Sequence, residues 1–273
     1  MAPGSLLLCI IACMGYAVPV LAQGVSVSPT RLFFTGSPGE RVVQVVRVEN
    51  PSTQKMVFKL ALKDFVRDSL GEKVYSDASS NPGSNAKWVQ LLSNTVELAP
   101  GEKKEIPVYL LIPTDKKLSQ QGVSRSMLFL SQLNEQQDAQ GRPAGRSVGI
   151  HVKLEIGIHV YYTPDHCTKR DLEFISFDDR GSVANGKDTL RRFAIVVKNQ
   201  GDVSTDAAVR LELTDKQSGQ EMPIPEKRIT LLPGARQIVY MDLPVLKGHF
   251  LAIAMLDTGD QNDLKVAEKD LTY

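Results

Sequence analysis

The sequence has few of the residues that carry covalent or catalytic chemistry. It contains three cysteines, and two of them, Cys9 and Cys13, lie in an apolar stretch at the N-terminus. Cys167, the remaining one, cannot form an internal disulfide, so we expect the fold to be held by its hydrophobic cores. No glycine-rich phosphate loop, nucleophile elbow or metal-ligand spacing occurs in the sequence. We therefore expect a protein that is not an enzyme and needs no cofactor.

The sequence also lacks an excess of charge of either sign. Its 32 Lys and Arg residues are balanced by 31 Asp and Glu residues. Proteins that bind nucleic acid through its phosphates need a surplus of basic side chains. Nucleic acid is therefore not an expected partner.

Long apolar runs are almost absent. The main one, residues 6–22, is short for a membrane span and ends in the small residue Ala22. Its position and its end are typical of a signal peptide, so we expect residues 1–22 to be removed on export. Lipoprotein processing at Cys13 is the alternative. No later run approaches the length of a membrane span, and we expect none in the mature protein.

Short runs rich in Val, Ile, Leu and Phe fill the first half of the remaining chain. Most of them alternate apolar and polar residues, which is typical of strands with one buried face. Seven such runs with turn residues between them predict a β-sandwich. Polar stretches at Asp68–Ala86 and Asn134–Arg146 are expected to be loops. The predicted strands are Val25–Phe34, Arg41–Glu49, Val57–Phe65, Trp88–Leu92, Lys104–Leu111, Ser126–Leu133 and Val148–Tyr162.

The second half repeats this pattern after a break at Pro164, where a strand cannot continue its ladder. Its predicted strands are Leu172–Phe177, Arg191–Lys198, Ala207–Thr214, Arg228–Leu232, Arg236–Leu243, Phe250–Leu256 and Lys265–Leu271.

Two local echoes indicate a duplicated domain type. Leu98–Gly101 and Leu231–Gly234 each place a Pro-Gly turn before an alternating strand, and Val48–Asn50 resembles Val197–Asn199. The alternative is that unrelated β-rich segments share such turns. The sequence therefore predicts an all-β chain of two immunoglobulin-like β-sandwich domains in tandem, residues 24–163 and 164–273.

One enzyme-like motif is present, Asp257-Thr258-Gly259, which matches the short signature of aspartic proteases. Such enzymes need two carboxylates that share a proton, and the sequence has no second copy of the motif. We interpret it as a turn, and an aspartic-type hydrolase remains the minor alternative.

The most informative segment runs from Ile150 to Tyr161. Six apolar residues alternate along it, over about twice the usual strand length. A strand this long can extend past its own core and offer a free hydrogen-bonding edge to a partner. A long strand that is fully paired within the protein is the equal alternative.

Five short segments of residues 24–165 form an ordered set: Ser28–Phe34, Val48–Asn50, Leu98–Gly101, Ser124–Phe129 and the run from Ile150 to Pro164. In this order they resemble the landmarks of the periplasmic pilus-assembly (PapD-like) chaperones. The resemblance implies a periplasmic protein shaped as a boomerang, with a cleft that holds an exported, pilin-like subunit.

In that family a long strand completes the subunit's unfinished sheet, and an Arg and a Lys in the cleft bind the subunit's C-terminal carboxylate. The resemblance implies that Arg31 binds the carboxylate. It also implies a set of strand-donor residues, namely Ile150, Val152, Leu154 and Ile156.

The sequence departs from the family where His159 occupies the position of the lysine. A histidine with an ordinary pKa is mostly neutral at pH 7. Either His159 binds as a neutral donor, or Lys153 or another base replaces it, or the carboxylate contact is lost. The alternative function is a secreted or surface immunoglobulin-like adhesion or binding protein with no chaperone role. The sequence leaves open whether an outer-membrane usher takes part.

Overall fold

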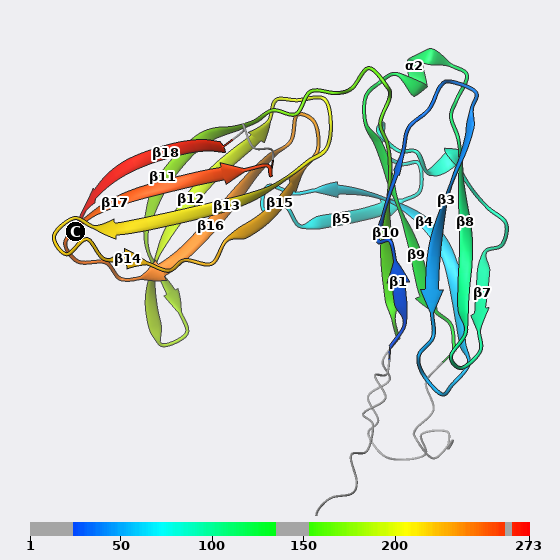
Figure 1. The fold of residues 1–273 in the computed structure, drawn as a ribbon, viewed down its shortest axis with the longest axis horizontal. Coiled ribbons are helices and arrows are strands. Elements are labelled where there is room, and N and C mark those ends of the chain that lie inside the picture. Colours follow the sequence, from blue (N-terminus) through cyan, green and yellow to red (C-terminus); the bar gives the residue numbers. More distant parts are fainter. Residues whose placement is uncertain (1–23, 135–152, 260–263) are drawn as a thin grey trace, which may run out of the picture.

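The computed structural model describes residues 24–134, 153–259 and 264–273, and these residues form two β-sandwiches set at an angle to each other (Figure 1). The predicted all-β class and the tandem arrangement are thus confirmed. The expected signal peptide and the donor residues Ile150 and Val152 lie outside the described residues. The predicted boundary at residue 164 falls between the last strand of the first sandwich and the first strand of the second.

The first sandwich packs a four-stranded sheet, in the order β1-β3-β8-β6, on a six-stranded sheet, in the order β2-β10-β9-β4-β5 with β7 also paired to β4. Its strands are β1 (Ser26–Ser28), β2 (Arg31–Phe34), β3 (Arg41–Glu49), β4 (Met56–Arg67), β5 (Lys73–Asp77), β6 (Val89–Leu91), β7 (Thr95–Leu98), β8 (Lys103–Leu111), β9 (Ser124–Gln132) and β10 (Glu155–Tyr162). Two short helical turns, η1 (Ala86–Trp88) and α2 (Lys116–Ser119), connect strands.

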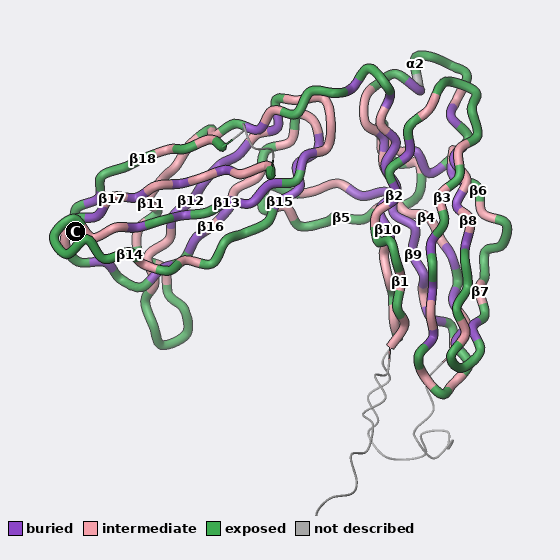
Figure 2. Tube along the Cα trace, in the orientation of Figure 1, coloured by how far each residue is buried: buried purple, intermediate pink, exposed green. Residues whose placement is uncertain are grey.

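Apolar side chains from both sheets fill the space between them, where the tube in Figure 2 is coloured as buried. Phe58, Leu128 and Val160, one from each of three adjacent strands, are wholly inaccessible to solvent. Burying an apolar side chain of this size contributes about 1.5–3 kcal/mol, so this core alone explains why the domain needs no disulfide.

The predicted strand Val25–Phe34 is divided into two strands that belong to different sheets. β1 pairs with β3, whereas β2 pairs in parallel with the end of β10. The break falls at Pro29, which has no N–H to donate to a ladder. The chain therefore leaves one sheet for the other at this point, and β2 covers only the last four residues of β10.

The prediction of a loop over Asp68–Ala86 was wrong in part, because Lys73–Asp77 forms β5 and pairs with the end of β4. We call the resulting hairpin, residues 63–77, the arm. The arm reaches from the first sandwich to the second (Figure 1). At its tip, the Ser69 carbonyl accepts a hydrogen bond of 2.7 Å from the Ile238 amide, and the Leu70 carbonyl accepts one of 3.1 Å from the Gln237 side chain.

The second sandwich packs a three-stranded sheet, β11-β12-β16, on a five-stranded sheet, β14-β13-β17-β18 with β15 paired to β13. Apolar side chains of both sheets form its core. Its strands are β11 (Leu172–Asn185), β12 (Asp188–Asn199), β13 (Thr205–Asp215), β14 (Glu221–Met222), β15 (Lys227–Leu231), β16 (Arg236–Pro244), β17 (His249–Asp257) and β18 (Leu264–Thr272).

Each sandwich contains a corner of the same construction, built on a buried asparagine, as the repeated sequence segments suggested. The Asn50 side chain donates to the Leu98 carbonyl at 3.2 Å, and the Asn199 side chain donates to the Leu231 carbonyl at 3.0 Å. In each Pro-Gly turn the glycine amide donates to the carbonyl of that asparagine. Both glycines have φ near +70°, which side chains rarely adopt. The echoes therefore correspond to one structural corner used twice.

Candidate functional site

The two halves of β10 differ in how they are paired. β9 pairs with β10 along its whole length, whereas β2 pairs with it only from His159 to Tyr162. Among the described residues, no strand pairs with the other side of Glu155–Ile158. The first half of β10 therefore presents an open edge. The edge is open because the residues before Pro29 pair with β3 in the other sheet, and only the residues after it, in β2, pair with β10.

The hydrogen bonds around β10 show which backbone groups face that edge. The His159 amide donates to the Thr30 carbonyl at 2.9 Å, on the β2 side, whereas the Leu154 carbonyl accepts from the Gln132 amide at 2.8 Å, on the β9 side. Because successive residues of a strand point their amides to opposite sides, Glu155 and Gly157 direct their N–H and C=O groups to the open edge. These groups could pair with an added strand.

The apolar side chains of β10 become less buried toward its open half. Ile158 and Val160 are wholly buried, whereas Leu154 and Ile156 are half-buried and pack against the same core. The predicted donor residues that the structure describes therefore lie at the margin of the core, beside the open edge.

Arg31 lies at the end of this edge, directly opposite His159 in the ladder. Its guanidinium contacts the second domain, where Nη1 lies 2.6 Å from Oδ2 of Asp206. Thr230 donates to the other oxygen of this carboxylate at 2.6 Å. Both members of the ion pair keep considerable solvent exposure, so the pair contributes at most about 1 kcal/mol to stability. Arg31 thus lies in the cleft, already paired with an acid of its own chain.

His159 is buried among aromatic rings and does not carry the charge of the lysine it replaces. Its ring stacks on Tyr161, with Nδ1 3.1 Å from the Tyr161 hydroxyl, and meets Phe65 edge to face. Burial, with the positive charges of Lys73, Arg67 and Arg31, lowers the pKa of His159 to about 4. The ring is therefore neutral at pH 7, and a neutral donor is the only contact that it could offer a carboxylate. Lys153 is exposed and precedes β10, at the end of the strand far from Arg31.

A pocket of about 680 Å³ lies between the two domains, next to Arg31. Residues of β2, the arm, β15 and β16 line it, and its described lining contains a single carboxylate, Glu72. Five cationic side chains line the pocket: Arg31, Arg67, Lys73, Lys227 and Arg228. The cleft implied by the family resemblance is thus present, and it is strongly basic.

Sequence reasoning missed the two cations of the arm. Arg67 donates through Nη1 to the Gly71 carbonyl at 2.7 Å, while its buried Nε has no hydrogen-bond partner. Burial, Arg67 and Arg31 lower the pKa of Lys73. No local signal could have placed these residues in the cleft, because they reach it only through the docking of the arm on β16.

The remaining candidates are structural. Asp257 accepts a hydrogen bond of 2.8 Å from the Gly259 amide and pairs with Arg210, which agrees with the turn interpretation. Cys167 is buried. The described residues contain no cluster of metal-binding side chains and no helix with the length and apolarity of a membrane span.

No protein-family model matches the sequence, and no curated protein matches it either. Solved structures do resemble it. The class 5 fimbriae chaperone CfaA is 14% identical, with a TM-score of 0.45 over 90% of this chain and 99% of CfaA. A chain of the complex of Salmonella enterica SafA pilin with the SafB chaperone is 12% identical, with a TM-score of 0.47 over 89% of this chain and 95% of its own length.

A chain from a chaperone–tip adhesion subunit complex of the Csu pili of Acinetobacter baumannii is 11% identical, with a TM-score of 0.47, covering 90% of this chain and 97% of that one. Likeness at this level does not assign a function.

Proposed function

We propose that this protein is a periplasmic chaperone for pilus-type subunits, which binds an exported client by adding a client strand to the open edge of β10. The observation that carries the proposal is the half-paired state of β10: Glu155 and Gly157 direct backbone groups to an edge that β2 leaves free. Backbone pairing gives affinity in strand addition, and neighbouring apolar side chains give specificity. Leu154 and Ile156 supply such side chains, and Ile150 and Val152 would extend the row.

The charge of the cleft selects the direction of the added strand. A client strand on the open edge ends where β2 begins, at Arg31. If it runs parallel to β10, as β2 does, its C-terminal carboxylate arrives beside the cations of the cleft. If it runs antiparallel, a positively charged N-terminus would arrive there and be repelled. We therefore propose the parallel direction, with Arg31 binding the carboxylate and His159 beside it as a neutral ring.

Burying a client strand at this edge also protects the client. An unpaired strand edge in an exported subunit is a template for aggregation, and pairing with β10 would cover it. This role requires no catalysis and no cofactor, and it leaves export through residues 1–22 and transfer to an outer-membrane usher as parts of the same proposal.

Substitution of Glu155 tests the open edge directly. A proline at this position removes an amide that faces the edge and leaves the backbone hydrogen bonds to β9 intact. Both substitutions remove the hydrogen bond of 2.7 Å that the Glu155 carboxylate accepts from Ser131 of β9, so Glu155→Ala controls for that loss. We expect Glu155→Pro to abolish co-purification of a small β-rich subunit from the periplasm of the native host, while Glu155→Ala retains it. Urea unfolding should show that both variants are folded. A Glu155→Pro protein that still brings the subunit with it would contradict strand addition at this edge.

A further inference from the structure

Charges in the interdomain pocket are unevenly compensated. Asp206 pairs with Arg31, and Glu226 pairs with Arg228 at 2.9 Å. For Arg67 and Lys73, by contrast, no ion pair with a described residue is formed, although Glu72 is nearby in the lining. The positive charge that remains available in the pocket therefore comes from Lys227 and from the arm rather than from Arg31.

The arm is fixed in place by the second domain. Its tip accepts hydrogen bonds from β16 through the Ser69 and Leu70 carbonyls. Gly71 has a φ of +87°, and a Cβ atom there would lie 2.1 Å from the Gln237 side chain. The positive φ favours glycine, and a side chain there would displace the Gln237 amide that binds the tip. The docking fixes the tip of the arm, and Arg67 and Lys73 form the strand pair next to it, so both are held at the pocket wall before any ligand arrives.

Arg67 lines the pocket with a guanidinium that is only partly hydrogen-bonded. Nη1 donates to the Gly71 carbonyl, and the buried Nε has no acceptor among the described residues. An anion in the pocket would supply a further acceptor for the guanidinium, and a carboxylate fits it because both can form two parallel hydrogen bonds.

We propose that Arg67 and Lys73 of the arm are the main carboxylate-binding residues of the cleft, and that Asp206 is an internal competitor that occupies Arg31 until a client carboxylate arrives. This inference rests on the proposed function, since it takes the ligand to be the terminus of a client strand. The main contact with the client carboxylate is then made by the arm, which the sequence predicts to be a loop, and not by Arg31 and His159 of the β2–β10 ladder.

Two synthetic peptides test the proposal. Both are N-acetylated nonapeptides in which valine alternates with serine, one with a free carboxyl terminus and one amidated. Measured by calorimetry on the full chain, the free acid should bind about tenfold more tightly than the amide, since one charge-assisted hydrogen bond is worth about that factor.

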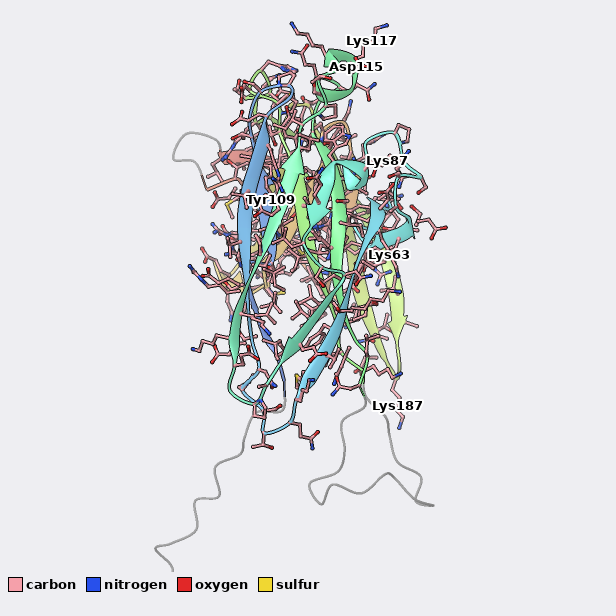
Figure 3. All side chains as sticks on the ribbon, turned by 90° about the vertical axis from the view of Figure 1, so that its right-hand side faces the viewer. Lys63, Lys87, Tyr109, Asp115, Lys117 and Lys187 are labelled. Carbon is pink, nitrogen blue, oxygen red and sulfur yellow. The ribbon has the colours of Figure 1, made fainter. Side chains whose placement is uncertain are left out.

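Substitutions then assign the preference to residues. Arg67→Gln and Lys73→Gln should each reduce it about threefold or more, and together they should remove most of it, leaving only the part that Arg31 supplies. Asp206→Asn should strengthen binding of the free acid alone, because it releases Arg31. Lys187→Gln is the matched control, since Lys187 is exposed at the tip of the β11–β12 hairpin (Figure 3) and should leave both affinities unchanged. A double variant Arg67→Gln/Lys73→Gln with the full preference for the free acid would overturn the proposal.

His159 provides an independent reading, because its pKa responds to the charges of the arm. In imidazole NMR, trifluoroacetate, a carboxylate that stays ionised at pH 4, should raise the His159 pKa in the unmodified chain and not in the double variant. If trifluoroacetate acts so but neither peptide binds, strand addition fails and the anion site stands. If both peptides bind equally, strand addition stands and the arm site fails. If neither peptide binds and trifluoroacetate has no effect, both fail.

Discussion

The last strands of the two domains, β10 and β18, both have an unpaired edge, but only that of β18 carries lysine side chains. Each leaves an edge without a strand partner among the described residues: β10 over its first half, and β18 along the side not paired with β17. β18 guards its edge with charge, since Lys265 lies 2.8 Å from Asp171 and Lys269 donates to the Phe177 carbonyl of β11. Lysines on an edge discourage pairing with other chains.

The open half of β10 carries no lysine, and its one charged side chain, Glu155, accepts a hydrogen bond from Ser131 of β9. Its outward groups are the backbone of Gly157 and Glu155, and its neighbours Leu154 and Ile156 are apolar and half-buried. Two domains with the same asparagine corner and the same kind of sandwich thus differ in one respect: the first keeps an edge available, and the second closes it. That difference supports placing partner binding on the first domain.

The largest expected effect distinguishes the two halves of β10. Val160→Ala removes a wholly buried side chain from the half that pairs with β2 and should lower the free energy of unfolding by about 1.5–3 kcal/mol. Ile156→Ala, in the open half, should lower it by about 1 kcal/mol or less, because its side chain is already partly exposed. Urea unfolding followed by circular dichroism measures both. Equal losses would show that the open half is as firmly part of the core as the paired half.

The shared corner should respond alike in both domains. Asn50→Ala and Asn199→Ala each leave buried carbonyls without a donor, and each should lower the free energy of unfolding by about 1–3 kcal/mol. Trp88, the single tryptophan, reports on the first domain by fluorescence, and circular dichroism reports on both. A large loss of unfolding free energy for one substitution and none for the other would mean that the two corners have the same geometry but do not contribute equally to stability.

The buried imidazole of β10 predicts a pH dependence that β18 does not share. The pKa of His159 is about 4 in the folded chain and near 6.5 when unfolded. The unfolded state therefore binds more protons between these values, and stability should fall as the pH drops from 6.5 toward 4. At pH 5 the loss from this group is up to about 2 kcal/mol.

Comparison with His159→Gln isolates this contribution, because other groups titrate in the same range. The variant should lose less stability than the unmodified chain between pH 7 and pH 5 in urea unfolding. Identical losses would mean that the ring is protonated in the folded state as readily as in the unfolded one.

The smallest effect on stability concerns the guarded edge. Replacement of Lys265 and Lys269 by valine should change the free energy of unfolding by less than about 1 kcal/mol, because the ion pair of Lys265 keeps partial solvent exposure and Lys269 makes only one long hydrogen bond. It should nevertheless increase self-association, measured by light scattering, because the edge of β18 loses its charges. Valine at Lys187 and Lys247, which lie off this edge, is the control. Equal scattering from both double variants would show that the lysines of β18 do not protect its edge from self-association.

Local patterns were sufficient to predict most of the fold. Alternation placed strands within a few residues of β3, β8 and β17, and the Pro-Gly echoes anticipated the two corners. The failures have local causes. Pro29 divides a strand whose alternation continues across it, and the arm lies in a stretch of Ser, Asn, Gly and Pro that reads as a loop. β5 forms because β4 extends to Arg67 and its tip docks on β16, a contact between residues far apart in the chain.

The candidate site was less predictable than the fold. The resemblance led to Arg31, but its acid partner lies 175 residues away. The charge of His159 depends on burial and on cations from β2, β4 and β5, which no spacing in the sequence relates. The sequence supplied the alternating apolar run but not the extent of the strand. β10 begins only at Glu155, and Lys153 and Leu154 lie outside it, so the expected double length is not confirmed by the described residues.

Leu232, in the Pro-Gly turn of the second domain, packs with Phe65, Met127, Phe129 and Tyr161 on the outer face of the first domain's larger sheet. A chain made from its N-terminus completes the first sandwich well before this leucine is available. Until then, this apolar, aromatic surface would remain exposed to solvent on a first domain that is otherwise folded. The second sandwich therefore covers an apolar surface of the first. A fragment that ends near residue 165 should aggregate, even though its own core is complete.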